Sequence, residues 1–196
     1  NGQIAKELNL LEEVKCIGRN QVDLMQPEKC AEIIYRLRPS AVINAAAYTN
    51  VDQAEENEDI AFIINSHAPK KMADACAKIG IPIVHISSDY VFNNKGNKSI
   101  LSTDKTNPIN LYGFSKLAGE EAVQKSGAIY SIVRTSWVIS AHGTNFVKKM
   151  LEFSEKKKSI DVVIDQIGGP TPAKDIAKAC FFIAKELQVN AYKSSL

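Results

Sequence analysis

This sequence has little excess charge of either sign, no closely spaced cysteine pairs and no long apolar runs. Its 196 residues carry 24 basic and 22 acidic side chains, a formal net charge of +2. Neither sign is concentrated as a nucleic-acid-binding or membrane-binding surface requires. The four cysteines are widely separated, which argues against a zinc site and a small disulfide framework. We therefore expect a protein that acts on small molecules and binds neither nucleic acid nor a membrane.

No apolar run approaches the roughly 18 residues needed to cross a bilayer, and no basic-then-apolar start of an exported protein is visible. The expected location is therefore the cytoplasm. The first residue is Asn1 rather than Met, so the sequence leaves the true N-terminus open. His67, His85 and His142 neither cluster nor stand four residues apart, and we predict no metal site.

The sequence does contain an alternation of short β-branched runs with longer helical patterns. Its 45% hydrophobic and 23% charged residues suit one globular domain, which we place at residues 1–196. The alternation predicts an α/β fold, a doubly wound Rossmann-type parallel sheet with helices on both faces. The expected strands are residues 14–18, 41–44, 83–87, 129–134 and 161–164, and the expected helices are residues 4–11, 27–37, 60–79, 112–124, 145–157 and 175–187.

The start of the chain predicts part of a dinucleotide site. Gly2 and Gln3 open the first expected helix, where backbone N–H groups can approach a pyrophosphate. This fold normally has its central first strand just before that glycine, so we expect the first strand to be missing from this chain. Arg19 follows the strand expected at residues 14–18, where folds that prefer the non-phosphorylated cofactor tend to carry an acidic residue. It indicates NADPH, with NADH as the alternative, although a plain surface arginine is an equally good interpretation.

Polar residues follow the expected strands, at the edge of a parallel sheet where ligands bind. Ser88 follows the strand at residues 83–87 in this way, two dozen residues before Tyr112. Tyr112 and Lys116 stand four residues apart, so a helix places the phenol and the ammonium on one face. A neighbouring cation favours the phenolate, and we expect a lowered pKa for Tyr112 and a proton donor usable near neutral pH.

The spacing of Tyr112 and Lys116 is weak evidence by itself, because 6 Tyr and 20 Lys in 196 residues supply ~0.6 such pairs by chance. Ser88 alone would be better explained as a turn cap than as a catalytic residue. Together the three residues favour a carbonyl reductase site, in which Ser88 holds the substrate oxygen and Tyr112 protonates it.

Several strings in a fixed order are more specific than any one of them. They lie at residues 44–49 (NAAAYT), 51–55 (VDQAE), 87–92 (SSDYVF), 108–120 (PINLYGFSKLAGE), 134–138 (RTSWV), 145–147 (NFV) and 165–171 (DQIGGPT). Along nearly its whole length the chain resembles the dTDP-4-dehydrorhamnose reductases, a family of extended short-chain dehydrogenases/reductases. The resemblance implies NADPH-dependent reduction of the 4-keto group of a dTDP-linked 6-deoxysugar. The product, dTDP-L-rhamnose, would serve rhamnose-containing cell-surface polysaccharide.

The resemblance also implies roles for individual residues. Ser88, Tyr112 and Lys116 are then catalytic, and Lys116 also holds the nicotinamide ribose. Asp89 and Trp137 match substrate-side positions, with Ser88 beside the carbonyl. The expected cofactor-binding residues are Gly2, Gln3, Ile4, Arg19, Asp23, Leu24, Ala47, Tyr48, Thr49, Tyr112 and Lys116.

The chain departs from the family pattern at its C-terminal end. Residues from about 137 onward are expected to form the base of a small substrate-binding lobe, and most of that lobe lies outside the chain. A homodimer is an expected assembly, but Lys174 replaces a carboxylate of the magnesium-bridged dimer known in some members, so we predict no metal there. Two alternatives stay open: a reductase or epimerase of another nucleotide sugar, and a non-catalytic protein like the regulatory subunit of methionine adenosyltransferase.

Overall fold

The computed structural model of the chain describes residues 2–93, 99–164 and 166–194, the last five by their backbone only. A three-stranded parallel sheet lies at its centre, with the strands in sequence order. Ile83 of the middle strand lies opposite Val42 on one side and Tyr130 on the other. The strands are β1 (Val42–Asn44), β2 (Ile83–Ser88) and β3 (Tyr130–Thr135).

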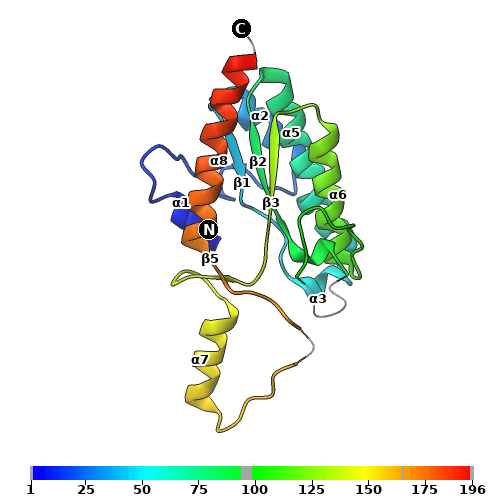
Figure 1. The fold of residues 1–196 in the computed structure, drawn as a ribbon, viewed down its shortest axis with the longest axis vertical. Coiled ribbons are helices and arrows are strands. Elements are labelled where there is room, and N and C mark those ends of the chain that lie inside the picture. The colour runs from blue at the N-terminus through cyan, green and yellow to red at the C-terminus, as the bar shows by residue number, and fades with distance from the viewer. Residues whose placement is uncertain (1, 94–98, 165, 195–196) are drawn as a thin grey trace.

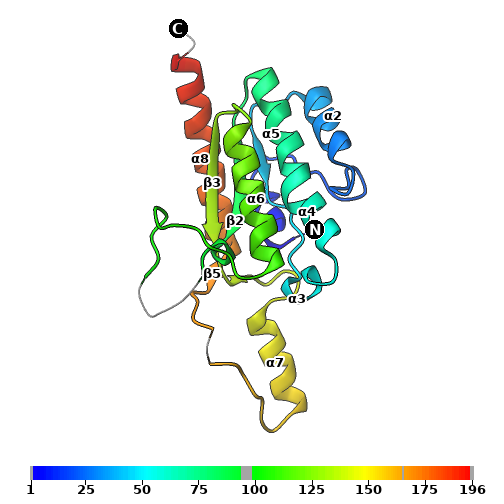
Figure 2. The ribbon, with the colours of Figure 1, turned by 90° about the vertical axis from the view of Figure 1, so that its right-hand side faces the viewer.

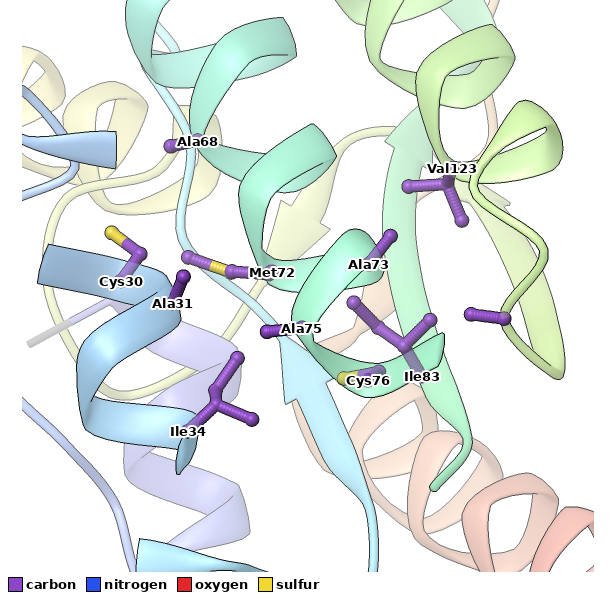
Figure 3. Packing of buried hydrophobic residues seen from close by; sticks show 11 residues of the cluster. Cys30, Ala31, Ile34, Ala68, Met72, Ala73, Ala75, Cys76, Ile83 and Val123 are labelled. Atoms are coloured by element: carbon purple, nitrogen blue, oxygen red, sulfur yellow. The ribbon is translucent and has the colours of Figure 1, made fainter. Parts of the chain in front are cut away.

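One face of the sheet is covered by the helices drawn in blue to green in Figure 1: α2 (Pro27–Leu37), α5 (Ala68–Ile79) and α6 (Leu111–Lys125). Pro27 suits the first turn of α2, and Gly80 ends α5 with a φ of 71°. Figure 3 shows Ile34 and Met72 between α2 and α5, and Ile83 of β2 next to Ala73 and Cys76 of α5.

The opposite face is covered by α1 (Gln3–Leu8) and α8 (Ala173–Ser194), as Figure 2 shows for α8. Ile4 and Leu8 pack with Ile176 and Cys180 against Val84 of the sheet. All six residues of β2 are therefore buried, the pattern of a strand covered on both faces. The predicted doubly wound α/β arrangement is confirmed.

Two expected strands are wrong. Residues 14–18 and 161–164 form no ladder of hydrogen bonds with another described strand. A β-strand forms only where a neighbouring strand supplies backbone N–H and C=O partners. In the second region Ile164 is 95% exposed. The ladder there joins β4 (Val138–Ile139) to β5 (Thr171–Pro172) instead.

The helix expected at residues 60–79 is divided into three parts. It begins as α4 (Glu58–Phe62), continues through the π-helical turn η1 (Ile63–His67) and becomes α5. The short helix α3 (Val51–Ala54) precedes it, and the 3-10 turn η2 (Asp89–Val91) follows β2. No helix within the described residues is long and apolar enough to span a membrane.

Beyond the carboxyl ends of the strands lies the segment that we call the lobe, residues 137–172, with α7 (Phe146–Lys156) extending away from the sheet (Figures 1 and 2). No residue of α7 is buried, although its apolar side chains include Leu151, which is 61% exposed. The chain thus consists of a packed core and an open lobe.

Candidate active site

Helix α6, which carries two of the predicted catalytic residues, is capped by Asn110, whose side-chain Oδ1 accepts a hydrogen bond of 2.8 Å from the N–H of Gly113. This cap fixes the first turn, which contains Tyr112. Lys116 follows one turn later, and both side chains are buried. Ser88 ends β2, directly before η2. The structure therefore brings the three predicted catalytic residues together at the carboxyl edge of the sheet.

Two glycines allow α6 to come this close to its neighbours. A Cβ at Gly113 would collide with the carbonyl oxygen of Tyr90 in η2, and one at Gly119 would collide with the carbonyl oxygen of Asn65 in η1. Any larger residue would have to push the helix away from Ser88 or from the π-helical turn. The glycines in the 108–120 string thus serve the placement of Tyr112 and Lys116.

The hydroxyl of Ser88 lies next to the Tyr112 phenol, where hydrogen bonding to it favours the phenolate. The Tyr112 ring also packs edge-on against Tyr90, with centroids 5.4 Å apart and planes at 79°. Burial raises the pKa of the phenol, and the Ser88 hydrogen bond opposes that rise. The lowered pKa predicted from the Tyr–Lys spacing is therefore wrong for this structure, because removal from water outweighs any help from the cation.

Lys116 directs its ammonium into the sheet, where Nζ donates a hydrogen bond of 2.7 Å to the carbonyl oxygen of Ile86. Burial lowers its pKa to about 8, and the nearby Glu120 carboxylate opposes this. The group is protonated at neutral pH and loses its proton as the pH rises past about 8. A buried cation therefore lies one helical turn from the phenol.

Glu120 is itself buried and binds Arg134 of β3 through two parallel contacts. Arg134 Nε lies 2.9 Å from Oε1 and Nη2 lies 2.6 Å from Oε2. The guanidinium also stacks 4.9 Å from the centre of the Phe92 ring and donates to the carbonyl oxygen of Ser102. This bidentate pair joins α6 to β3 and to the loop at residue 102.

A hollow of about 540 Å³ opens beside these residues. Asp89 and Thr135 line it, and burial raises the pKa of the Asp89 carboxyl while a 3.2 Å hydrogen bond from Ser88 opposes the rise. Thr135 Oγ1 is buried and has no hydrogen-bond partner among the described residues. A ligand oxygen or N–H group in the hollow could satisfy it.

Trp137 begins the lobe in an uncommon conformation, with a φ of 43°. Its ring lies 5.4 Å from that of Phe146, and a Cβ at Gly168 would collide with its indole nitrogen. Its carbonyl oxygen accepts a hydrogen bond of 3.1 Å from the N–H of Thr171. Backbone strain of this kind is held only where the surroundings fix it, as they do here.

Residues 1–195 match the model of one protein family, the RmlD substrate binding domain. The chain belongs to this family. It is 40% identical over 191 residues to a dTDP-4-dehydrorhamnose reductase of Sinorhizobium fredii, covering 95% of this chain and 64% of that relative. It is also 36% identical over 173 residues to a dTDP-4-keto-6-deoxy-D-glucose reductase of Streptomyces niveus, covering 86% of this chain and 59% of the relative.

A solved structure supports the same membership of the RmlD family. The dTDP-4-dehydrorhamnose reductase of Bacillus anthracis, in complex with NADP, is similar with a TM-score of 0.90 at 35% identity. The similarity covers 95% of this chain and 68% of that one. The chain thus spans about three fifths of the length of the two curated relatives, 64% and 59%. The predicted family and Rossmann-type fold class are confirmed.

Not every residue predicted to line a cofactor in this RmlD-family chain presents its side chain to solvent. The side chain of Ile4 is buried in the core, and that of Leu24 packs against the other core cluster. Arg19 has a side chain 74% exposed, and its Nε lies 3.4 Å from Asp23 Oδ2. A Cβ at Gly2 would meet no atom within 4 Å, so a ligand could approach that side of the Gly2 backbone.

Sequence reasoning missed Asn65, a buried residue of η1. Its side-chain amide pairs with both backbone groups of Tyr48: the Tyr48 N–H donates to Oδ1 at 2.9 Å, and Nδ2 donates to the Tyr48 oxygen at 3.0 Å. Nδ2 also lies 3.0 Å from Oγ of Ser115, beside Lys116. Asn65 therefore joins the segment of Ala47, Tyr48 and Thr49 to α6. No sequence signal singles it out within a helical pattern.

Proposed function

We propose that the protein reduces the 4-keto group of a dTDP-linked 6-deoxysugar with NADPH, converting dTDP-4-dehydro-L-rhamnose to dTDP-L-rhamnose. The observation that carries the proposal is the placement of the Tyr112 phenol next to the Ser88 hydroxyl, with the buried Lys116 one helical turn away. Asp89, which follows Ser88, lines the neighbouring hollow. The names of the Sinorhizobium and Streptomyces relatives support a reductase of dTDP-linked keto-sugars.

The residues present fit a dinucleotide. Gly2 has no atom within 4 Å of where a Cβ would stand, which leaves that side of its backbone accessible to a pyrophosphate, and the exposed Arg19 cation can pair with a 2′-phosphate. Tyr48 is held in place after β1 by Asn65. When bound, NADPH would supply the hydride that the carbonyl carbon accepts. The NADP complex of the Bacillus anthracis relative supports this choice, with NADH as the alternative.

Ser88, Tyr112 and Lys116 would position the substrate carbonyl and supply the proton. Ser88 would turn its hydroxyl from Asp89 to the substrate carbonyl and hold that oxygen next to Tyr112. Tyr112 would donate its phenolic proton to the same oxygen as the carbon is reduced. Lys116, one helical turn along α6, would stabilise the phenolate that remains until solvent returns a proton. The raised pKa of Tyr112 keeps the phenol protonated before the reaction, as a proton donor requires.

The decisive experiment follows NADPH absorbance when purified protein is mixed with dTDP-4-dehydro-L-rhamnose. We expect turnover, and we expect Tyr112→Phe to lower kcat at least about a hundredfold because the general acid is lost. Tyr35→Phe is the matched control, since this tyrosine is exposed on α2, in the helix layer away from the lobe. Normal turnover by Tyr112→Phe would contradict the proposal.

A second candidate is the reduction of another nucleotide-linked keto-sugar, favoured by the name of the Streptomyces relative. A panel of dTDP-linked 4-keto-6-deoxysugars separates the two, since activity on a different sugar alone would select this candidate. A protein that binds a partner tightly and turns over none of the sugars would instead be a non-catalytic member. The homodimer and the cytoplasmic location stay predictions, and light scattering can test the first.

A further inference from the structure

A cluster of amide and hydroxyl groups joins α1 to the lobe across more than 130 positions of sequence. Gln3 lies at its centre and contacts three residues of the lobe. Its Nε2 donates to the carbonyl oxygen of Val138 at 3.1 Å, and its Oε1 accepts from Ser140 Oγ at 2.8 Å and from Asn145 Nδ2 at 3.0 Å. We call these four residues the Gln3 cluster.

The orientation of both amides is fixed by backbone partners. Gln3 Nε2 faces a carbonyl, which can only accept, so Oε1 must face Ser140 and Asn145. Asn145 Oδ1 accepts from the N–H of Lys148 at 3.1 Å, and its Nδ2 donates to the carbonyl oxygen of Ser140 at 2.8 Å. Each amide group therefore uses both of its ends, and no alternative orientation satisfies the same partners.

The surrounding loop closes tightly over Gln3. Gly143 has a φ of 60°, and a Cβ there would lie 3.4 Å from Gln3 Cγ. Lys148 Nζ donates to the carbonyl oxygens of Ala141 and Gly143, at 3.1 and 2.9 Å. His142 Nε2 lies 3.4 Å from Oε1 of Glu7, one turn along α1 from Gln3. Contacts with Gln3 and Glu7 of α1 thus hold the loop between β4 and α7 in place.

The Gln3 cluster reaches Trp137 from two directions. Val138, which receives the Gln3 hydrogen bond, directly follows Trp137, and Asn145 directly precedes Phe146, whose ring packs against the indole. Trp137 has the left-handed backbone that its surroundings must hold. A change at Gln3 would loosen both the backbone after Trp137 and the ring beside it.

We propose that Gln3 is a positioning residue for the sugar-nucleotide side of the site: through Val138 and Asn145 it holds the Trp137–Phe146 pair against the Rossmann core. The link to the sugar nucleotide rests on the proposed function. The placement of Trp137 itself does not, because it follows from the hydrogen bonds alone. Gln3 acts here through its side chain, which leaves its backbone N–H for the predicted pyrophosphate turn.

Three variants separate this role from others. Gln3→Ala removes the centre of the cluster. Asn145→Asp keeps the oxygen that caps α7 at Lys148 but loses the donor to Gln3 Oε1 and Ser140. Lys6→Ala is the matched control, since Lys6 lies on the same helix with an exposed side chain.

Trp137 is the only tryptophan of the 196 residues, so its fluorescence reports directly on the predicted change. We expect acrylamide to quench it about twofold more strongly in Gln3→Ala and Asn145→Asp than in Lys6→Ala, and amides of residues 138–148 to exchange faster. KM for the sugar nucleotide should rise about tenfold in both variants while kcat changes less than about threefold.

Unchanged quenching and exchange in both variants would overturn the proposal. So would a loss confined to kcat with KM unchanged, since it would place Gln3 in the chemical step. If the unaltered protein turns over no keto-sugar, the proposed function fails, and quenching and exchange still decide whether Gln3 holds Trp137.

Discussion

The Rossmann core and the lobe differ in how much each buries. β2 is buried along its whole length, whereas α7 has no buried residue. Ser88, Tyr112 and Lys116 belong to the core, where tight packing against η1 and η2 fixes them. Trp137 belongs to the lobe and depends on a few hydrogen bonds. The difference teaches that the residues proposed for the chemistry and the residue proposed for substrate recognition lie in parts of very unequal packing. Four pairs of substitutions test it.

The largest contrast is between two glycines. Gly119→Val would drive a side chain into the carbonyl oxygen of Asn65, and we expect loss of at least about 4 kcal/mol of stability or no folded protein. In the lobe, a Cβ at Gly169 would meet no atom within 4 Å, so Gly169→Ala should change stability by less than about 0.5 kcal/mol. Thermal unfolding of both variants measures the difference. Equal melting temperatures would contradict it.

The second contrast is between two ion pairs. Glu120→Gln breaks a bidentate pair whose carboxylate is 1% exposed, and we expect a cost of about 3 kcal/mol because Arg134 is left without its anion. Glu152→Gln in α7 breaks a pair with Lys156 whose side chains are 58% and 64% exposed, and should cost under about 0.5 kcal/mol. Urea unfolding gives both values. A Glu120→Gln cost as small as that of Glu152→Gln would show that the Glu120 pair contributes no more than a surface contact.

The third contrast concerns how the stability of the protein depends on pH through a lysine of the core and a lysine of the lobe. The folded pKa of Lys116, about 8, lies below its ordinary value of 10.5, so the unfolded chain binds more protons between these values. Stability contributed by this group therefore rises with pH across that window, by about 3 kcal/mol in total. Lys116→Met should remove the rise, while Lys149→Met in the lobe should keep it. Urea unfolding at pH 7.5 and 10 would show whether the two variants differ.

The smallest contrast compares apolar side chains. Met72→Ala in the core should cost about 2 to 3 kcal/mol through the cavity it leaves between α2 and α5. Leu151→Ala in α7 removes a side chain that is 61% exposed, and should change stability by less than about 0.5 kcal/mol. Calorimetry of the two variants measures both changes in stability. A large loss from Leu151→Ala would mean that the lobe is packed in solution.

Local patterns predicted much of the core. The alternation of strands and helices placed β2 and α6 within about two residues, and the polar residues after the strands led to Ser88. What the patterns lacked was tertiary context. Residues 14–18 look like a strand, but a ladder needs a neighbour. The Tyr112–Lys116 spacing suggested a lowered phenol pKa, and only the packing revealed the burial that raises it. Asn65 became visible only once Tyr48 and Ser115 were seen on either side of it.

The π-helical turn at residues 63–67 has a consequence for insertions and deletions along this helix. Deleting one residue there would allow an uninterrupted α-helix, which is locally the more favourable form. Because the wider π-turn accommodates one extra residue, the segments on either side would keep nearly their present rotation, and the change would fall on residues 63–67, Asn65 among them. Asn65 would then face away from Tyr48 or Ser115, and the two halves of the site would lose their common support. A shortened chain could therefore keep its helices and still lose the arrangement of its candidate active site.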